Sequence, residues 1–237
     1  MNIKLESIVE VQRATEQAMK KVIDYLKNSE KPNSETAHKI IDDILNIYNC
    51  ESPENHIVAG GVQAIDPHEE GFGNLTPGTA IVIDIYPRSR ETGFFADMTR
   101  TVCIGKSSAK LNKMYDSVLE AQNIAIKMLK PGRKCIDIQK KVEKYFEKNG
   151  YKTFGKGKEF KYSEGFVHGV GHGVSDILHD LPRIGRDTDD ILKEGDIITI
   201  EPGLYYKDIG GIRIEDLFLI TISGSKRITN FSNKFEI

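Results

Sequence analysis

Four acidic side chains stand in segments that are too apolar to leave a carboxylate simply in water. Asp84 lies in Ala-Ile-Val-Ile-Asp-Ile-Tyr, and Asp97 precedes Met-Thr-Arg-Thr. Glu201 follows Ile-Ile-Thr-Ile, and Glu215 stands in Arg-Ile-Glu-Asp. Burying even one unpaired carboxylate costs several kcal/mol, so four of them need compensating charge. Asp84 alone could pair with Arg100 or cap a turn, but the four together indicate one or two bound cations.

The histidines supply the nitrogen donors that such a site would use. His168, His172 and His179 are half of the six histidines in the chain and fall in one short segment. The glycines around them let the backbone approach closely, so we interpret these imidazoles as ligands or catalytic groups rather than as core histidines. One imidazole with four carboxylates suits Mn, Fe, Co or Zn. The absence of a cysteine cluster from the sequence disfavours a structural zinc site.

The helices and strands that must position these groups occur twice in the same order: a long helix, a shorter helix and a pair of strands. A long helix at 8–26, with apolar residues at three- and four-residue spacing, is followed by a second helix after the Lys-Pro-Asn-Ser break at 31–34. Strands are expected at 80–86 and 94–104, joined by a charged hairpin loop at 87–93. The second half is expected to contain a helix at 107–129, a shorter helix that ends at Gly150, and strands at 197–201 and 211–216. This order predicts two similar halves that meet near residue 104.

Composition excludes several classes of protein. The chain has 237 residues, and its 33 Lys and Arg against 35 Asp and Glu give a net charge of −2. That balance argues against nucleic-acid binding, and no stretch approaches the roughly 20 apolar residues of a membrane span. Three scattered cysteines form no disulfide framework and predict a cytoplasmic protein with reduced thiols. We interpret the short basic run at 156–161 as a solvated loop, with a loop flanking the substrate as the alternative.

The ordered acidic and imidazole residues resemble the pita-bread metallopeptidases, the family of methionine aminopeptidase, aminopeptidase P and Xaa-Pro dipeptidase (prolidase). The resemblance rests on Asp84, Asp97 in Ala-Asp-Met-Thr-Arg-Thr, His172 in Gly-His-Gly, Glu201 in Ile-Glu-Pro-Gly, and Glu215 in Arg-Ile-Glu-Asp. It implies an α+β pita-bread fold, in which two pseudo-symmetric helix–helix–strand halves surround a curved antiparallel sheet. It also implies that residues 1–237 form a single catalytic domain, without the separate N-terminal domain of many Xaa-Pro enzymes.

The same resemblance implies a site for two divalent metal ions. Asp97 and Glu215 would bridge them, Asp84 would complete the shell of one, and His172 with Glu201 would complete the shell of the other. Mn is the expected metal, with Co, Zn or Fe as alternatives. The implied chemistry is metal-assisted hydrolysis of a peptide with a free N-terminus, in which Glu201 also takes the proton from the attacking water.

Within this family the histidine pattern favours Xaa-Pro enzymes. His168-Gly-Val-Gly-His172 followed by His179-Asp180 is similar to their signature, and Arg213 and His68 match it as well. By the resemblance, His68, His168 and His179 would bind the substrate and stabilise the oxyanion, although His68 could be an exposed loop residue. Arg213 would support the ligand carboxylates or the substrate.

We therefore predict hydrolysis of an N-terminal Xaa-Pro bond by a monomer or homodimer with no nucleic-acid or membrane partner. Two alternatives remain, a methionine aminopeptidase and a non-catalytic binding protein of the same fold.

Two features depart from the family pattern. Tyr86 stands two residues after Asp84, where members of the family usually carry Gly. The separation of Asp84 and Asp97 is 13 positions (97 − 84), two more than usual. The loop at 87–92 is therefore expected to be longer and to change substrate access without moving the ligands.

Overall fold

The computed structural model describes residues 3–153 and 164–237, and its helices form two pairs. The basic run predicted at 156–161 lies outside the described residues. The helices are α1 (Ile3–Asn28), α2 (Ser34–Ile47), α3 (Ala109–Ile126) and α4 (Cys135–Lys148), with a short 3₁₀ turn, η1 (Gln63–Ile65). Asn33 caps α2 by accepting from the Thr36 amide at 2.8 Å, and Ser108 caps α3 by accepting from the Leu111 amide at 3.2 Å.

In the part of the chain that the structure describes, the strands form four antiparallel sheets. A three-stranded sheet has the order β2-β3-β5, a five-stranded sheet has the order β12-β11-β8-β6-β7, and two pairs are β1-β4 and β9-β10. The strands are β1 (Cys50–Glu51), β2 (Ile57–Gly60), β3 (Ile81–Ile85), β4 (Arg88–Ser89), β5 (Met98–Val102), β6 (Gly171–Gly173), β7 (Asp180–Ile184), β8 (Ile197–Ile200), β9 (Gly203–Tyr206), β10 (Gly210–Arg213), β11 (Asp216–Thr221) and β12 (Gly224–Arg227).

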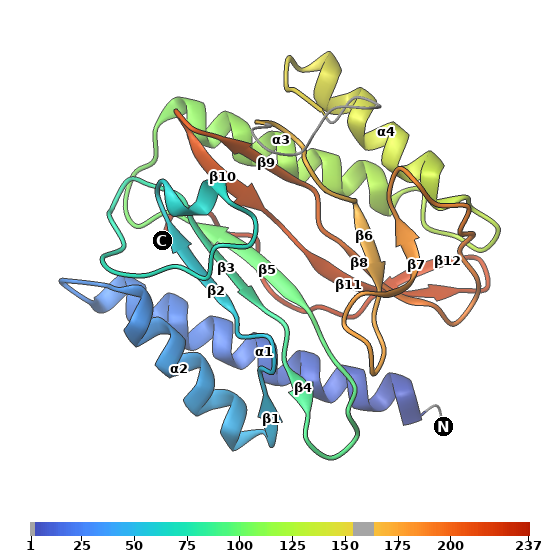
Figure 1. Cartoon of the computed structure of the whole chain (residues 1–237), viewed down its shortest axis with the longest axis horizontal. Helices are drawn as coiled ribbons and strands as arrows, with labels where there is room; N and C mark the ends of the chain where they lie inside the picture. Colours follow the sequence, from blue (N-terminus) through green and yellow to red (C-terminus); the bar gives the residue numbers. More distant parts are fainter. Residues whose placement is uncertain (1–2, 154–163) are drawn as a thin grey trace.

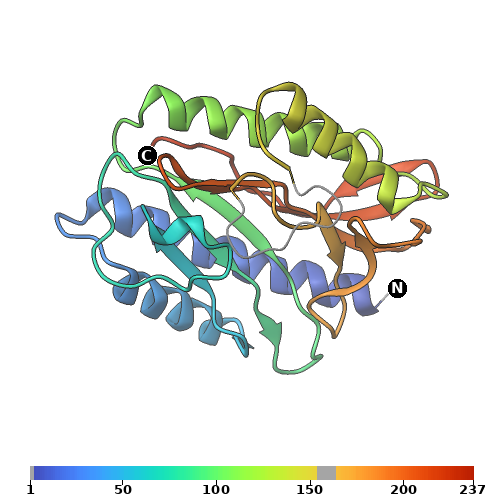
Figure 2. The same ribbon diagram turned by 45° about the horizontal axis from the view of Figure 1, so that its top comes forward.

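Each helix pair covers the strands of its own half. The long helix α1 packs on β3 and β5, and α3 packs on β8, β9 and β10. In Figures 1 and 2, α1 and α2 run along one side of the strands, and α3 and α4 run along the other. Two large clusters of buried apolar side chains fill the spaces under α1 and under α3. The two predicted halves are therefore present, and the β strands between them position the acidic residues.

Two strand predictions were wrong in their extent. The segment 211–216 is two strands rather than one, because β10 pairs with β9 whereas β11 pairs with β8. Glu215 lies at the break between them. The second strand of the first half is only Met98–Val102, since the residues before it bond outside the sheet: the Phe95 amide donates to the carbonyl oxygen of Ser175 at 2.8 Å.

The charged loop at 87–93 is fastened to the N-terminal helices. Its residues Arg88 and Ser89 form β4, which pairs with β1 directly after α2. Arg88 forms an ion pair with Glu51, at 2.5 Å, and the Arg90 side chain donates to Asn46 at 2.9 Å. No residue of 87–93 is among those that line the large cavity described below. Within the described residues, no helix is both long and apolar enough to cross a membrane.

Candidate metal centre

All nine residues singled out from the sequence line one cavity of about 600 Å³ between the two halves. They are His68, Asp84, Asp97, His168, His172, His179, Glu201, Arg213 and Glu215. They come from both large sheets, from the β9-β10 pair and from the loops between strands. The fold therefore brings together residues that are as far apart in the sequence as 68 and 215.

Two of the carboxylates reach the cavity from the three-stranded sheet. Asp84 is in β3 and pairs in register with Thr99 of β5, and Asp97 stands immediately before β5. Because side chains alternate along a strand, Asp97 shares the face of Thr99, and the register therefore places both carboxylates on the same face of this sheet. Both side chains are buried.

His172 reaches the cavity from β6, where the flanking glycines are required by close backbone packing. A Cβ at Gly171 would overlap the carbonyl oxygen of Thr199, and a Cβ at Gly173 would overlap the carbonyl oxygen of Leu181. His172 donates Nδ1–H to the Gly173 carbonyl oxygen at 3.0 Å. The lone pair of Nε2 therefore faces the cavity, the tautomer that a metal-binding histidine uses.

Glu201 and Glu215 complete the group from the other side. Glu201 follows β8, and its amide donates to the carbonyl oxygen of Val170 at 2.7 Å, which fixes it beside β6. Glu215 lies between β10 and β11, and its amide donates to the carbonyl oxygen of Thr99 at 3.1 Å. This bond joins the two halves directly at the site.

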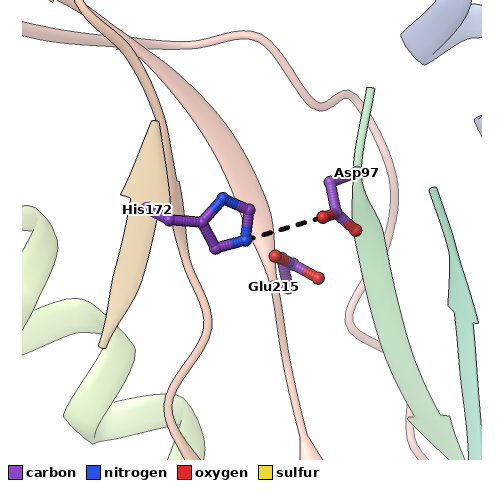
Figure 3. A group of neighbouring side chains, drawn as sticks. All are labelled: Asp97, His172 and Glu215. Atoms are coloured by element: carbon purple, nitrogen blue, oxygen red, sulfur yellow. Dashed lines mark ion pairs between the residues drawn. The ribbon is translucent and has the colours of Figure 1, made fainter. Parts of the chain in front are cut away.

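The donor atoms of these side chains converge within the cavity. Asp97, His172 and Glu215 each offer a ligand atom within 4.8 Å of the others. Figure 3 shows these three side chains pointing toward one another. His172 Nε2 lies 3.7 Å from Asp97 Oδ2 and 3.5 Å from Glu201 Oε1. Three carboxylate oxygens, Asp84 Oδ1, Asp97 Oδ1 and Glu215 Oε1, are buried and have no hydrogen-bond partner.

The protonation of these groups reflects the same crowding. Burial, together with the charges of Glu215, Asp84 and Glu201, raises the pKa of Asp97 well above its usual range. Burial and the charge of Asp84 raise the pKa of Glu215 to about 7, and burial with the charge of Glu215 raises that of Glu201. Burial lowers the pKa of His172 to about 4, so its imidazole is neutral at pH 7. A bound cation would offset both the burial of these carboxylates and their mutual repulsion.

The donor set therefore fits divalent metal ions. Unpartnered buried oxygens and a neutral imidazole facing one another are what a mixed nitrogen and oxygen site presents. The outer partners of a metal site are also present: Thr99 donates to Glu215 Oε2 at 2.7 Å, and Arg213 Nη2 donates to Asp84 Oδ2 at 2.7 Å. Each leaves the other oxygen of its carboxylate free to bind a metal.

Arg213 links the carboxylates to His168 through Tyr205. Arg213 Nη1 donates to Tyr205 Oη at 2.8 Å, and the Tyr205 hydroxyl lies 2.9 Å from His168 Nε2. His168 Nδ1 donates to the carbonyl oxygen of Gly169 at 2.8 Å, so Nε2 accepts from Tyr205. A substrate bond to His168 would have to replace the bond from Tyr205, which makes this imidazole less available than the sequence predicts.

His68 and His179 are the more accessible imidazoles. Both are exposed at the cavity wall, and the ring of His179 lies 4.6 Å from the ring of His172. The amide of His68 donates to Asp66 Oδ1 at 2.9 Å, and the adjacent carbonyl of Pro67 accepts from Arg213 at 3.2 Å. These bonds hold the loop of His68 against the site.

The structure adds residues that the sequence analysis did not assign to the site. Glu54, Tyr86, Arg183 and Asp187 also line the cavity. Of these only Tyr86 had a signal in the sequence, since it stands two residues after Asp84 and side chains alternate along a strand. The others lie in loops or on an exposed strand, where no local pattern predicts which way a side chain faces.

Comparisons with known proteins show the family and the fold of the chain. A model of metallopeptidase family M24 matches residues 6–222. The Xaa-Pro dipeptidase of Pyrococcus furiosus is 33% identical over 228 residues, which cover 94% of this chain and 62% of that protein. Among solved structures, the prolidase from Pyrococcus furiosus superposes with a TM-score of 0.85 at 29% identity, covering 98% of this chain and 65% of that one. The X-Pro aminopeptidase from Thermotoga maritima superposes with a TM-score of 0.87 at 25% identity, covering 99% and 63%.

These likenesses confirm the α+β pita-bread fold that the sequence predicts. The chain spans less than two thirds of the length of each of these relatives.

Proposed function

The chain belongs to metallopeptidase family M24, and on that premise we propose that it is a dinuclear-metal exopeptidase that hydrolyses an N-terminal Xaa-Pro peptide bond. The observation that carries this proposal is the convergence of three unpartnered buried carboxylate oxygens and the His172 Nε2 lone pair at one cavity. The names of the similar proteins, Xaa-Pro dipeptidase, prolidase and X-Pro aminopeptidase, support the substrate class.

The five ligands of our proposal are those predicted from the sequence. Asp84, Asp97, His172, Glu201 and Glu215 would together hold two ions. Mn suits a site so rich in carboxylate oxygens, with Co, Zn or Fe as alternatives. Bound divalent ions supply Lewis-acid polarisation of a carbonyl group and lower the pKa of a water molecule.

The remaining chemistry belongs to side chains of this chain. Glu201 is the general base in our proposal, because its carboxylate lines the cavity, is 18% exposed, and lies 3.5 Å from His172 Nε2 at the metal centre. His179 and His68 stand at the cavity wall, where their N–H groups donate to the substrate carbonyl as its charge develops. Arg213 and Tyr205 orient Asp84 and His168.

Further parts of the proposal concern the molecule as a whole. We propose that residues 1–237 act as one catalytic domain, which the enclosure of the site by both halves supports. The buried free thiols of Cys50, Cys103 and Cys135 support a cytoplasmic location, since such thiols persist in a reducing compartment. The partner is a small peptide with a free N-terminus, and the active form is a monomer or homodimer.

Release of amino acids by the metal-stripped protein tests the proposal. The substrates are Ala-Pro, Ala-Pro-Ala and Met-Gly, each with and without added Mn²⁺. We expect Mn²⁺-dependent release of Ala from an Ala-Pro peptide and none of Met from Met-Gly. Release of Met alone would instead make the protein a methionine aminopeptidase. Binding of Mn²⁺ without any turnover would favour a binding protein.

A further inference from the structure

Tyr86 places an aromatic ring at the wall of the cavity, beside the carboxylate group. It follows the end of β3, and because side chains alternate along a strand it faces the same way as Asp84. Both side chains line the cavity. The resemblance described above predicts glycine at this position, so the ring occupies space that the family pattern leaves open.

The ring is held in place from two directions. Its hydroxyl donates to the carbonyl oxygen of Glu54 at 3.2 Å, in the turn that precedes β2. Its side chain packs against the small apolar cluster of Ile57, Ala59, Ala64 and Val82. A half-buried tyrosine with a bonded hydroxyl and packed ring has few other rotamers available, so this wall is rigid rather than adaptable.

The wall contributed by the other half combines large side chains, such as His179 and Arg183, with three glycines. Gly169, Gly171 and Gly185 line the cavity from the segments around β6 and β7. Arg183, in β7, is an exposed cation on that same half. If the scissile carbonyl lies at the carboxylate group and the free carboxylate of a dipeptide lies toward Arg183, the N-terminal residue of the substrate lies on the side of Tyr86.

We propose that Tyr86 is a specificity-determining residue, whose ring limits the size of the N-terminal side chain that the cavity accepts. This inference rests on the proposed Xaa-Pro activity. The substrates it selects are Xaa-Pro peptides whose first residue is small, such as Ala, over those whose first residue is aromatic, such as Phe. A fixed ring next to a reacting centre excludes bulk because closely packed atoms do not give way without strain.

The test compares kcat/KM for Ala-Pro and Phe-Pro in the Mn²⁺-loaded protein. Tyr86→Ala should lower the preference for Ala-Pro over Phe-Pro by about tenfold or more, because single pocket contacts change such ratios by about 10- to 200-fold. Tyr86→Phe is the matched control, since it keeps the ring and loses only the bond to Glu54, and it should retain the wild-type ratio. Tyr86→Leu keeps apolar packing with less bulk and should give an intermediate ratio of kcat/KM for Ala-Pro over Phe-Pro. If Tyr86→Ala does not fold, this variant tests the inference in its place.

Binding of free amino acids provides a readout that does not depend on turnover. Calorimetry with L-phenylalanine and L-alanine should show that Tyr86→Ala gains affinity for phenylalanine relative to alanine, whereas Tyr86→Phe does not. This inference alone would be overturned if the wild-type protein cleaves Xaa-Pro peptides but Tyr86→Ala keeps the wild-type ratio of kcat/KM for Ala-Pro over Phe-Pro within about twofold. A wild-type protein that cleaves no Xaa-Pro peptide would overturn the proposed function and this inference with it.

Discussion

Thr99 shows how a single hydroxyl orders the carboxylates at the level of the residue. It is fully buried, donates to Glu215 Oε2 at 2.7 Å, and accepts from Arg213 Nε at 3.2 Å. Arg213 in turn donates to Asp84. Thr99 therefore determines which oxygen of Glu215 is left to face the other donor atoms.

Thr99→Val should weaken Mn²⁺ binding by about 10- to 100-fold, the usual effect of losing an outer partner of a metal ligand. The measurement is calorimetric titration of the metal-stripped protein with Mn²⁺. Thr15→Val is a matched control, because Thr15 is also a buried threonine but bonds only within α1, to the Val11 carbonyl oxygen at 3.0 Å. Equal Mn²⁺ affinity in wild type and Thr99→Val would show that Thr99 has no such role.

Arg183 offers a second prediction at this level, because its exposed guanidinium lies in the cavity wall. A charge-assisted bond to the carboxylate of a dipeptide contributes about 1.5–3 kcal/mol, so Arg183→Gln should raise KM for Ala-Pro by about tenfold or more. Hydrolysis of Ala-Pro-amide, which lacks that carboxylate, should change little. Exposed Lys193 lies away from this cavity, and Lys193→Gln is the control. Equal losses for both substrates would rule out recognition of the carboxylate.

At the level of elements, the position of His172 depends on the close packing of β6 against β8. Gly171→Ala should lower the free energy of unfolding by about 1–3 kcal/mol, because its Cβ would overlap the Thr199 carbonyl oxygen and push β6 away. It should also weaken Mn²⁺ binding, since His172 would move with the strand.

Urea unfolding and Mn²⁺ titration measure these two effects. Gly224→Ala is the control, since the nearest atom to its added Cβ, the Leu129 carbonyl oxygen, is at 3.9 Å. A Gly171→Ala protein as stable as Gly224→Ala would contradict the packing argument.

The strands also show which parts of the site could be predicted from the sequence alone. The carboxylates were predictable because charged groups inside apolar segments are anomalous wherever they occur, and His172 was predictable because three histidines cluster in a glycine-rich segment. The break at Glu215 was not, because the exchange of partners from β9 to β8 depends on pairing between distant segments rather than on local pattern. Arg183 and Glu54 were missed for the same reason, since long-range packing decides whether their loop or strand faces the cavity.

At the level of the whole molecule, the C-terminal segment fastens the two halves together. The Cys103 amide, just after β5, donates to the Phe235 carbonyl oxygen, and the Ile237 amide donates to the Cys103 carbonyl oxygen, both at 2.9 Å. Glu236 accepts from Lys106 Nζ at 2.8 Å and from the Ser107 amide at 3.1 Å. These bonds join the C-terminal segment, which belongs to the second half, to the connection between the two halves at 103–107.

The stabilisation from Glu236 should depend on pH. Its bonds to Lys106 and Ser107 lower its pKa from 4.5 to about 2. Because the pKa is lower in the folded state, the ionised carboxylate stabilises the fold above about pH 4.5, and this contribution is lost as the pH falls toward 2. Urea unfolding should therefore show Glu236→Gln to be less stable than wild type at pH 7, with a difference that shrinks between pH 4.5 and 2. If the difference in the free energy of unfolding between the two proteins stays constant from pH 4.5 to 2, the stabilising role of the ionised Glu236 carboxylate is contradicted.

The number of Mn²⁺ ions bound per chain tests the central claim most directly. Metal-stripped wild type and Asp97→Asn are titrated with Mn²⁺ in the calorimeter, and the bound metal is counted independently by elemental analysis. The claim predicts two ions per wild-type chain and loss of at least one in Asp97→Asn, because Asp97 is one of the five proposed ligands. A wild-type protein that binds no Mn²⁺, or an Asp97→Asn protein that binds it as wild type does, would contradict the assignment of this site.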